Sequence, residues 1–210
     1  MDIIALKKTI TAQYFDFQSL KAAIVGHVNE RRFIGQLIKR GYIVRVKKGL
    51  YIWGDQLDSG GFSKEILANL VYGPSYISLE SALAFYGLIP ERVETVTSVT
   101  FKKNKIFDTP VGSFAYVHLY KRAYTKGVHL HMINLRERYL IADPEKALLD
   151  YIALRVRRID AHTSFSQLLS TDIRIDHNQF ARLSTDLLVQ YGAFYRSRAV
   201  REFTRKVRHG

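Results

Sequence analysis

The spacing of apolar residues changes abruptly within residues 29–53, NERRFIGQLIKRGYIVRVKKGLYIW. In the first half, apolar residues recur at helical spacing, which predicts an amphipathic helix over residues 29–40, with Asn29 as its N-cap. The apolar face of that helix consists of Phe33, Ile34, Leu37 and Ile38. The second half alternates apolar and polar residues and turns at Lys48-Gly49, which predicts a β-hairpin over residues 45–51. A helix is therefore followed directly by a hairpin.

The segment before this helix, DFQSLKAAIVGH, predicts another short helix that buries Leu20, Ala23 and Ile24 and turns at Gly26. Helix, glycine turn and basic helix is the order of a helix-turn-helix, and a hairpin beside the second helix is a wing. The pattern therefore predicts a winged helix-turn-helix domain over residues 1–54.

The outward face of the predicted second helix carries side chains suited to DNA. Arg32 and Lys39 are cations, Gln36 can hydrogen-bond base edges, and Gly35 leaves room for a close approach in the major groove. The predicted DNA-binding residues are Asn29, Arg31, Arg32, Gln36 and Lys39 on the helix, with Arg45, Lys47 and Lys48 on the hairpin. A winged helix used only for protein contacts is the alternative.

The polar stretch DQLDSGGF, residues 55–62, predicts a boundary, after which residues 62–210 form a second domain. This domain opens with two short helices that end at glycines, over residues 63–73 and 78–87. Alternating segments over residues 93–101, 113–120, 127–133 and 138–142 then predict an antiparallel sheet, in which Val93, Val99 and Phe101 share one face. Helices over residues 143–156 (capped by Asp143), 180–192 and from about 193 onward complete an α+β fold.

The charge balance favours a polyanionic partner. Lys and Arg total 32 against 19 Asp and Glu, which gives a net charge of +13. The excess lies at the two ends, because residues 1–55 carry ten basic and four acidic residues, and residues 144–210 carry twelve and seven. The last predicted helix places Arg198, Arg201, Arg205 and Arg208 on one face. That face is either solvated surface or a second surface for nucleic acid or an acidic partner.

The absence of cysteine excludes a disulfide framework, a thiolate metal site and a cysteine nucleophile, and it fits a reducing compartment. No apolar run approaches the roughly 18 residues of a membrane span, and MDIIALKKTI lacks the pattern of a secretory signal. These features predict a soluble cytoplasmic protein without a membrane partner.

Signs of enzyme chemistry are weak. His129 and His131 share a face of a predicted strand, but two histidines without a third ligand at diagnostic spacing favour an ordinary histidine pair over a metal site. The charged residues of ADPEK are explained by helix capping. The sequence contains no P-loop, no GxGxxG after a strand and no GxSxG elbow. We therefore expect no enzymatic activity, no cofactor and no metal.

Three segments together resemble the AbiEi-type antitoxin family, the regulatory halves of bacterial abortive-infection toxin–antitoxin pairs. They are GYIVRVKKGLYIW, YGPSYISLESALAFYGLIPE and YLIADPEKALLDYIAL, within residues 15–155, and the last two are far more specific than the first. The resemblance implies a DNA-binding repressor of its own operon, whose second domain counteracts a nucleotidyltransferase-like toxin without necessarily forming a stable complex. It places the DNA-reading helix at residues 29–40 and the wing at 45–51, and it transfers no catalytic residue. The strand-rich segment FKKNKIFDTPVGSF differs from many relatives.

Two other classes of function remain open. A winged-helix transcription factor with a ligand-sensing C-terminal domain is the main alternative, with Phe114, Tyr116 and Tyr120 either lining a pocket or forming the core. A nuclease is the third. The expected partner in the first two classes is double-stranded operator DNA, bound by a monomer, by a dimer or cooperatively.

Overall fold

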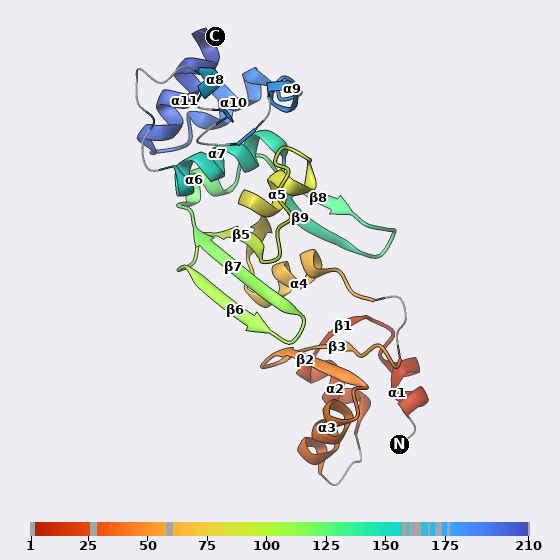
Figure 1. Cartoon of the computed structure of the whole chain (residues 1–210). Helices are drawn as coiled ribbons and strands as arrows, with labels where there is room; N and C mark the ends of the chain where they lie inside the picture. Colours follow the sequence, from red (N-terminus) through yellow and green to blue (C-terminus); the bar gives the residue numbers. More distant parts are fainter. Residues whose placement is uncertain are drawn as a thin grey trace.

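The computed structural model describes residues 3–25, 29–57, 61–156, 159, 165–167, 169–170, 174–175 and 177–209. The molecule is a mixed α+β structure with its N-terminal helices at one end, a large sheet in the middle and its C-terminal helices at the other end (Figure 1). Within the described ranges, no helix combines the length and the apolar character needed to cross a bilayer.

The N-terminal part contains the predicted helices and hairpin. Its elements are α1 (Ile3–Thr9), β1 (Tyr14–Asp16), α2 (Phe17–Ala23), α3 (Glu30–Lys39), β2 (Ile43–Lys47) and β3 (Leu50–Trp53). The strands pair antiparallel in the order β1-β3-β2. Strand β1 was not predicted, because three residues are too short to show an alternation. The predicted turn at Gly26 lies outside the described residues.

A small core holds these elements together. Trp53 is buried, and its indole Nε1 donates to the carbonyl oxygens of Ile10 at 3.2 Å and Ala12 at 3.0 Å. These bonds tie the chain between α1 and β1 to the end of the hairpin. Helix α3 buries Ile34 and Leu37 in the same core, as its apolar face predicts, whereas Ala23 of α2 is only half-buried. The α3 face opposite this core therefore points outward.

The second part is built on a mixed sheet with the strand order β6-β7-β5-β4-β9-β8 within the described residues. Its elements are α4 (Lys64–Val71), β4 (Ser75–Ile77), α5 (Leu79–Phe85), β5 (Val96–Thr100), β6 (Lys105–Thr109), β7 (Gly112–His118), α6 (Lys121–Tyr124), β8 (Val128–Met132), β9 (Arg138–Ala142), α7 (Pro144–Arg155), α8 (Phe165–Gln167), α9 (His177–Phe180), α10 (Thr185–Gly192) and α11 (Arg198–His209). Strands β5 and β7 run parallel, as do β4 and β9. The sheet predicted as antiparallel therefore contains both antiparallel and parallel pairs.

The unpredicted strand β4 forms one of the two parallel pairs, the pair with β9. It lies between two helices in the sequence, pairs with β5 on one side and β9 on the other, and has no exposed residue to reveal an alternation. The prediction that Val93, Val99 and Phe101 share one strand face is wrong. Strand β5 starts at Val96, is buried along its whole length and ends before the exposed Phe101.

The C-terminal helices differ from the prediction at their boundaries. Residues 180–192 were expected to form one helix, but α9 ends at Phe180 and α10 begins at Thr185. Ser184 starts α10 as its N-cap, because its side chain accepts from the backbone nitrogen of Leu187. The last helix starts at Arg198 rather than near residue 193.

The two parts of the chain pack against each other along the hairpin. Val46, Leu50 and Ile52 of the hairpin belong to the larger core, which also contains α4 and the mixed sheet. In addition, the backbone nitrogen of Ser63 donates to the hydroxyl of Tyr14 in β1 at 2.7 Å. The hairpin sheet is therefore covered on one face by the N-terminal helices and on the other by the second part of the molecule.

Candidate nucleic-acid interface and a buried charge cluster

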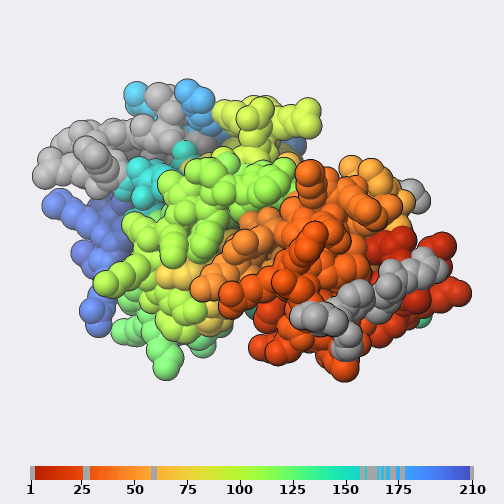
Figure 2. Space-filling view, turned by 90° about the horizontal axis from the view of Figure 1, so that it is seen from below, coloured from red at the N-terminus to blue at the C-terminus, as the bar shows by residue number. Residues whose placement is uncertain are grey.

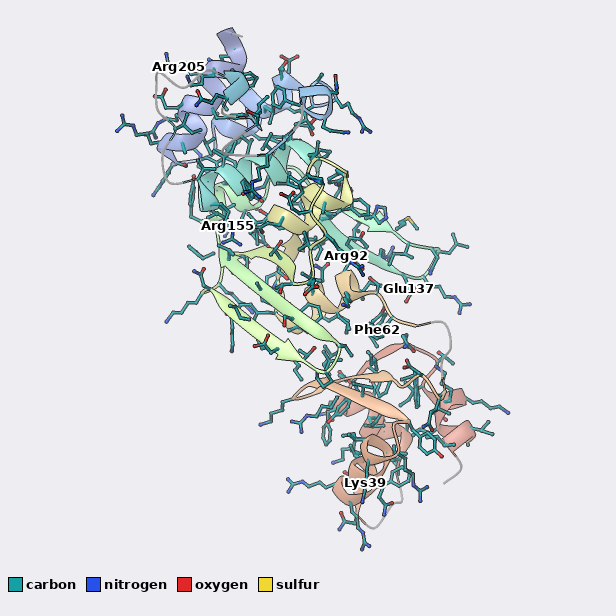
Figure 3. The ribbon with its side chains drawn as sticks, in the orientation of Figure 1. Lys39, Phe62, Arg92, Glu137, Arg155 and Arg205 are labelled. Atoms are coloured by element: carbon teal, nitrogen blue, oxygen red, sulfur yellow. The ribbon has the colours of Figure 1, made fainter. Side chains whose placement is uncertain are left out.

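Helix α3 lies at the free end of the molecule, remote from the C-terminal helices (Figure 1). It begins at the N-cap Asn29, whose side-chain oxygen accepts from the backbone nitrogen of Arg32 at 3.0 Å. Arg31, Gln36 and Lys39 are exposed on this helix, as is Arg32. Figure 3 labels Lys39 at this end of the molecule.

Among the described residues, no carboxylate forms an ion pair with the cations on the outward face of α3. Within the described part of the chain, Arg31, Arg32 and Lys39 form no ion pair. Glu30, the acidic residue in the first turn of α3, lies 3.8 Å from Lys21 of α2 instead. Gly35 lies on the exposed face, and a Cβ built there would meet no atom within 4 Å. The face is therefore cationic and open to a close approach.

The three predicted hairpin residues are placed differently from one another. Arg45 and Lys48 are exposed, and Gly49 makes the turn with a φ of +84°, a conformation that favours glycine. Lys47 is half-buried, and its ammonium donates to the carbonyl oxygen of Val71 at 2.6 Å. Burial, followed by the nearby charges of Lys102 and Lys105, lowers the pKa of Lys47. Lys47 therefore faces the second part of the molecule.

A lysine-rich segment of the second part lies beside the hairpin. The ammonium groups of Lys102 and Lys105 lie 5.2 and 5.7 Å from the ring centre of Tyr72, in the turn that follows α4. Lys102, Lys103 and Lys105 are all exposed. Seen from below, the orange surface of the N-terminal elements adjoins the green surface of β6 and β7 (Figure 2). The run FKKNK was visible in the sequence, but its place beside the hairpin follows only from the fold.

The arginines of the last helix form a separate surface at the opposite end of the molecule, where Figure 3 labels Arg205. All four predicted arginines of α11 are exposed: Arg198, Arg201, Arg205 and Arg208. Arg205 pairs with Glu202 at 3.0 Å, and Arg201 donates to the carbonyl oxygen of Arg196 at 3.3 Å. Two of the four arginines therefore already interact with groups in or just before α11.

One member of the predicted histidine pair, His131, packs against aromatic rings. The ring of His131 lies 5.0 Å from that of Phe85 and 5.1 Å from that of Tyr139, and His129 is exposed. Among the residues that the structure describes, no group of three His, Cys, Asp or Glu side chains is placed to hold a metal ion. The predicted pocket-lining aromatics Phe114 and Tyr116 are buried in the core, and Tyr120 is half-buried against it.

A buried charge cluster was missed by the sequence reasoning. Helix capping accounts for Asp143, whose side chain accepts from the backbone nitrogen of Lys146 at 2.8 Å. It does not account for Glu145, which is buried and accepts from the backbone nitrogen of Ser184 at 2.7 Å, or for Lys146. Lys146 and Asp150 are both 0% exposed and form an ion pair.

Hydroxyl groups from other elements complete this cluster around Asp150. Its Oδ1 accepts from Tyr195 at 2.6 Å, and its Oδ2 accepts from Tyr76 at 2.9 Å and from Ser78 at 2.8 Å. Lys146 also donates to the hydroxyl of Tyr195 at 2.6 Å. Burial raises the pKa values of Tyr76 and Tyr195, with the Asp150 charge as the second cause. Both phenols therefore stay protonated and donate to the carboxylate.

The cluster joins the two most specific segments of the family resemblance. Tyr76 and Ser78 belong to YGPSYISLESALAFYGLIPE, and Lys146 and Asp150 belong to YLIADPEKALLDYIAL. A buried charge needs its hydrogen-bond partners, so each segment requires the other. The hydrogen bonds from Tyr76 and Ser78 to Asp150 could not be predicted from the sequence, because these residues are 74 and 72 positions apart from Asp150.

A scan against protein-family models and a search of curated proteins give no match for this chain.

Proposed function

We propose that this protein is a DNA-binding transcriptional repressor whose N-terminal part acts as a winged helix-turn-helix. The observation that carries the proposal is the outward face of α3, where Arg31, Arg32 and Lys39 are exposed without ion-pair partners in the described chain. Such a face attracts phosphates, and the helix is free at the end of the molecule to enter a major groove (Figure 1).

In this proposal, Arg32, Gln36 and Lys39 enter the major groove, and Gly35 permits the close approach. Gln36 is the candidate for base readout, because its exposed amide can form two hydrogen bonds with adenine. Arg45 and Lys48 hold the phosphate backbone from the hairpin, and Arg31 does so from the margin of the helix. Asn29 positions the helix as its cap. Lys47 is assigned to the junction between the two parts, because its ammonium is bound to Val71.

The lysines beside the hairpin extend the same electrostatic surface. Lys102, Lys103 and Lys105 are exposed next to β2 and β3 and would meet backbone phosphates that flank the site read by α3. The second basic surface, on α11, lies at the opposite end of the molecule (Figure 3) and is not assigned to this stretch of duplex.

The regulatory role follows the resemblance to AbiEi-type antitoxins. The repressor would act on its own operon, and the second part of the chain would counteract a nucleotidyltransferase-like toxin. The buried cluster supports this reading in one respect: the two specific segments are required together by the fold. Because the cluster residues themselves are buried, toxin neutralisation would depend on exposed residues of the second part.

DNA binding is tested with the full chain and the DNA upstream of its gene, by fluorescence anisotropy over a range of salt concentrations. If about five cations reach phosphates, the logarithm of the binding constant should fall with the logarithm of salt concentration at a slope near −4.5. Gln36→Ala should reduce the preference for the upstream DNA over a scrambled sequence, by about 1–3 kcal/mol for a lost bidentate contact. Gln190→Ala, which removes an exposed amide from α10, is the matched control and should change nothing. Unchanged preference in Gln36→Ala, or a slope near zero, would contradict the proposal.

The antitoxin role is tested by co-expression with the product of the adjacent gene, scored as growth rescue. A variant with Arg32→Ala and Lys39→Ala separates the two activities better than a truncation, because removing the hairpin would cut into the shared core. Rescue by both the natural chain and this variant supports a neutralising function in the second part. Failure of the natural chain to rescue growth would remove the antitoxin role and leave the repressor.

A further inference from the structure

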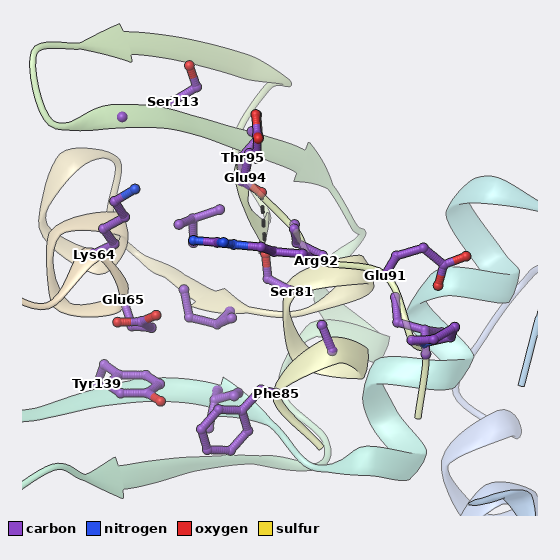
Figure 4. Close-up of a pocket in the computed structure, with 18 residues that line it drawn as sticks. Lys64, Glu65, Ser81, Phe85, Glu91, Arg92, Glu94, Thr95, Ser113 and Tyr139 are labelled. Atoms are coloured by element: carbon purple, nitrogen blue, oxygen red, sulfur yellow. Dashed lines mark hydrogen bonds between the residues drawn. The ribbon is translucent and has the colours of Figure 1, made fainter. Parts of the chain in front are cut away.

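A groove of about 770 Å³ opens in the second part of the molecule (Figure 4). Its walls come from α4, α5, residues 89–95 and the first residues of β7, and the sheet forms its floor. This volume lies within the range of roughly 300–1,000 Å³ that is common for small-molecule sites. The groove is separate from the surface assigned to DNA.

Two cations point into this groove from opposite sides. Figure 4 shows Arg92 of the 89–95 loop extending across the groove toward the side where Lys64 of α4 lies. A Cβ built on Gly112 would lie 3.4 Å from the ammonium of Lys64, which places that ammonium against the start of β7. Neither Lys64 nor Arg92 forms an ion pair within the described ranges. Two like charges directed at one space favour an anion between them.

The groove also offers a fixed apolar surface. Phe85 is 47% exposed, and its ring is held edge-on by Tyr86 and His131, both at 5.0 Å between ring centres. Ile77 and Ile141 line the floor beside it. Covering such a surface is favourable in proportion to the apolar area removed from water, and an aromatic ligand can pack against the ring.

Carboxylates in the groove limit the negative charge that it can accept. Glu65 lines the same groove, and one of its oxygens accepts from the hydroxyl of Ser63 at 2.7 Å. Burial, with Glu65 as the second cause, raises the pKa of Tyr139 to about 12, so this neighbour remains a neutral phenol. Glu91 and Glu94 also lie on the lining, and Glu91 is paired with Arg174 at 3.3 Å. Two cations facing three carboxylates, one of them already paired, suit a single negative charge better than a dianionic phosphate.

We propose that the groove binds a small organic carboxylic acid with an aromatic or branched apolar body. The carboxylate lies between Lys64 and Arg92, and the body lies against Phe85. This site goes beyond the proposed DNA-binding function and does not depend on it, because none of its residues belongs to α3 or the hairpin.

The test uses the full chain with benzoate, phenylacetate and 4-methylpentanoate as probes, measured by calorimetry and by saturation-transfer NMR in the absence of DNA. At least one acid should bind saturably. Arg92→Ala and Lys64→Ala should each weaken that acid about tenfold, as expected for the loss of one charged hydrogen bond. Phe85→Ala should weaken it severalfold. Arg182→Ala and Lys121→Ala remove exposed cations elsewhere and serve as matched controls with unchanged binding.

Phenyl phosphate and inorganic phosphate distinguish the type of anion. Weaker binding of phenyl phosphate than of benzoate supports the carboxylate assignment, and tighter binding overturns it. The proposal is also overturned if none of the three acids binds at millimolar concentration, or if binding is the same in Arg92→Ala and the natural chain. Unchanged thermal unfolding of the variants shows that lost binding is not lost folding. DNA binding enters none of these measurements, so failure of either proposal leaves the other standing.

Discussion

Removal of the Asp150 carboxylate should destabilise the protein more than removal of any surface carboxylate. Within the described chain, Asp150 accepts four hydrogen bonds, from Lys146, Tyr195, Tyr76 and Ser78. In Asp150→Ala, the Lys146 ammonium stays buried without its counter-charge and keeps the Tyr195 hydroxyl as its acceptor. The hydroxyls of Tyr76 and Ser78 lose the acceptor at the same time.

The magnitude follows from these losses. Breaking a buried ion pair by removing one member typically costs about 3–5 kcal/mol. Each hydroxyl left without an acceptor adds about 1–3 kcal/mol at most, and these contributions are not additive. We therefore expect a loss of at least about 3–5 kcal/mol, a large fraction of the roughly 5–15 kcal/mol that stabilises a typical domain.

The assay is equilibrium unfolding in urea at neutral pH, followed by circular dichroism and tryptophan fluorescence. Glu80→Ala is the matched control, because Glu80 pairs with Arg155 of the same helix α7 at 2.7 Å but at the surface. Loss of this surface ion pair in Glu80→Ala should lower the free energy of unfolding by no more than about 1 kcal/mol. If Asp150→Ala does not fold, Asp150→Asn keeps the shape and two hydrogen bonds, and it should show an intermediate loss.

A double substitution checks the origin of the effect. Lys146→Met combined with Asp150→Ala removes both charges, and it should recover part of the stability lost in Asp150→Ala alone. Equal losses in Asp150→Ala and Glu80→Ala, or no recovery in the double variant, would refute the reasoning that an uncompensated buried ammonium is the cause.

Three further predictions concern the hairpin and the groove. Lys47→Ala should lower the free energy of unfolding by about 1 kcal/mol, because the hydrogen bond to the carbonyl oxygen of Val71 is lost. Lys48→Ala should leave the free energy of unfolding unchanged and flatten the salt slope of DNA binding by about 0.9. A loss of stability in Lys48→Ala and a flatter salt slope in Lys47→Ala would exchange the roles of the two lysines. Gly49→Ala should cost about 1 kcal/mol in urea unfolding because of the φ of +84° at this turn. Because the pKa of Tyr139 is raised from 10.0 to about 12 in the folded state, its contribution to stability is complete below pH 10 and is lost as pH rises toward 12. Tyr139→Phe should therefore make urea unfolding less sensitive to pH in that interval, and an unchanged pH dependence would count against the raised pKa.

The sequence alone predicted the elements whose burial follows a regular period. Helix α3 was predicted with its cap Asn29, its buried Ile34 and Leu37, and its exposed Arg32 and Lys39, because a helix with one apolar face repeats every 3.6 residues. The hairpin turn at Gly49 was predicted because a tight turn requires residues that tolerate a positive φ. These are local rules, so they can be read without knowing the rest of the fold.

Only the tertiary structure decided which of these residues meet. Strand β4 shows no alternation because it is covered on both faces, and it pairs antiparallel with β5 and parallel with β9. The sequence explained the charge of Lys146 by helix capping and gave Asp150 no role, because the hydroxyls that satisfy these charges lie far away in the sequence. The contact between Lys47 and Val71 could not be predicted either, because these residues lie 24 positions apart in the sequence. Periodicity reports which face of an element is buried, whereas the identity of the neighbour is set by long-range packing that no local pattern encodes.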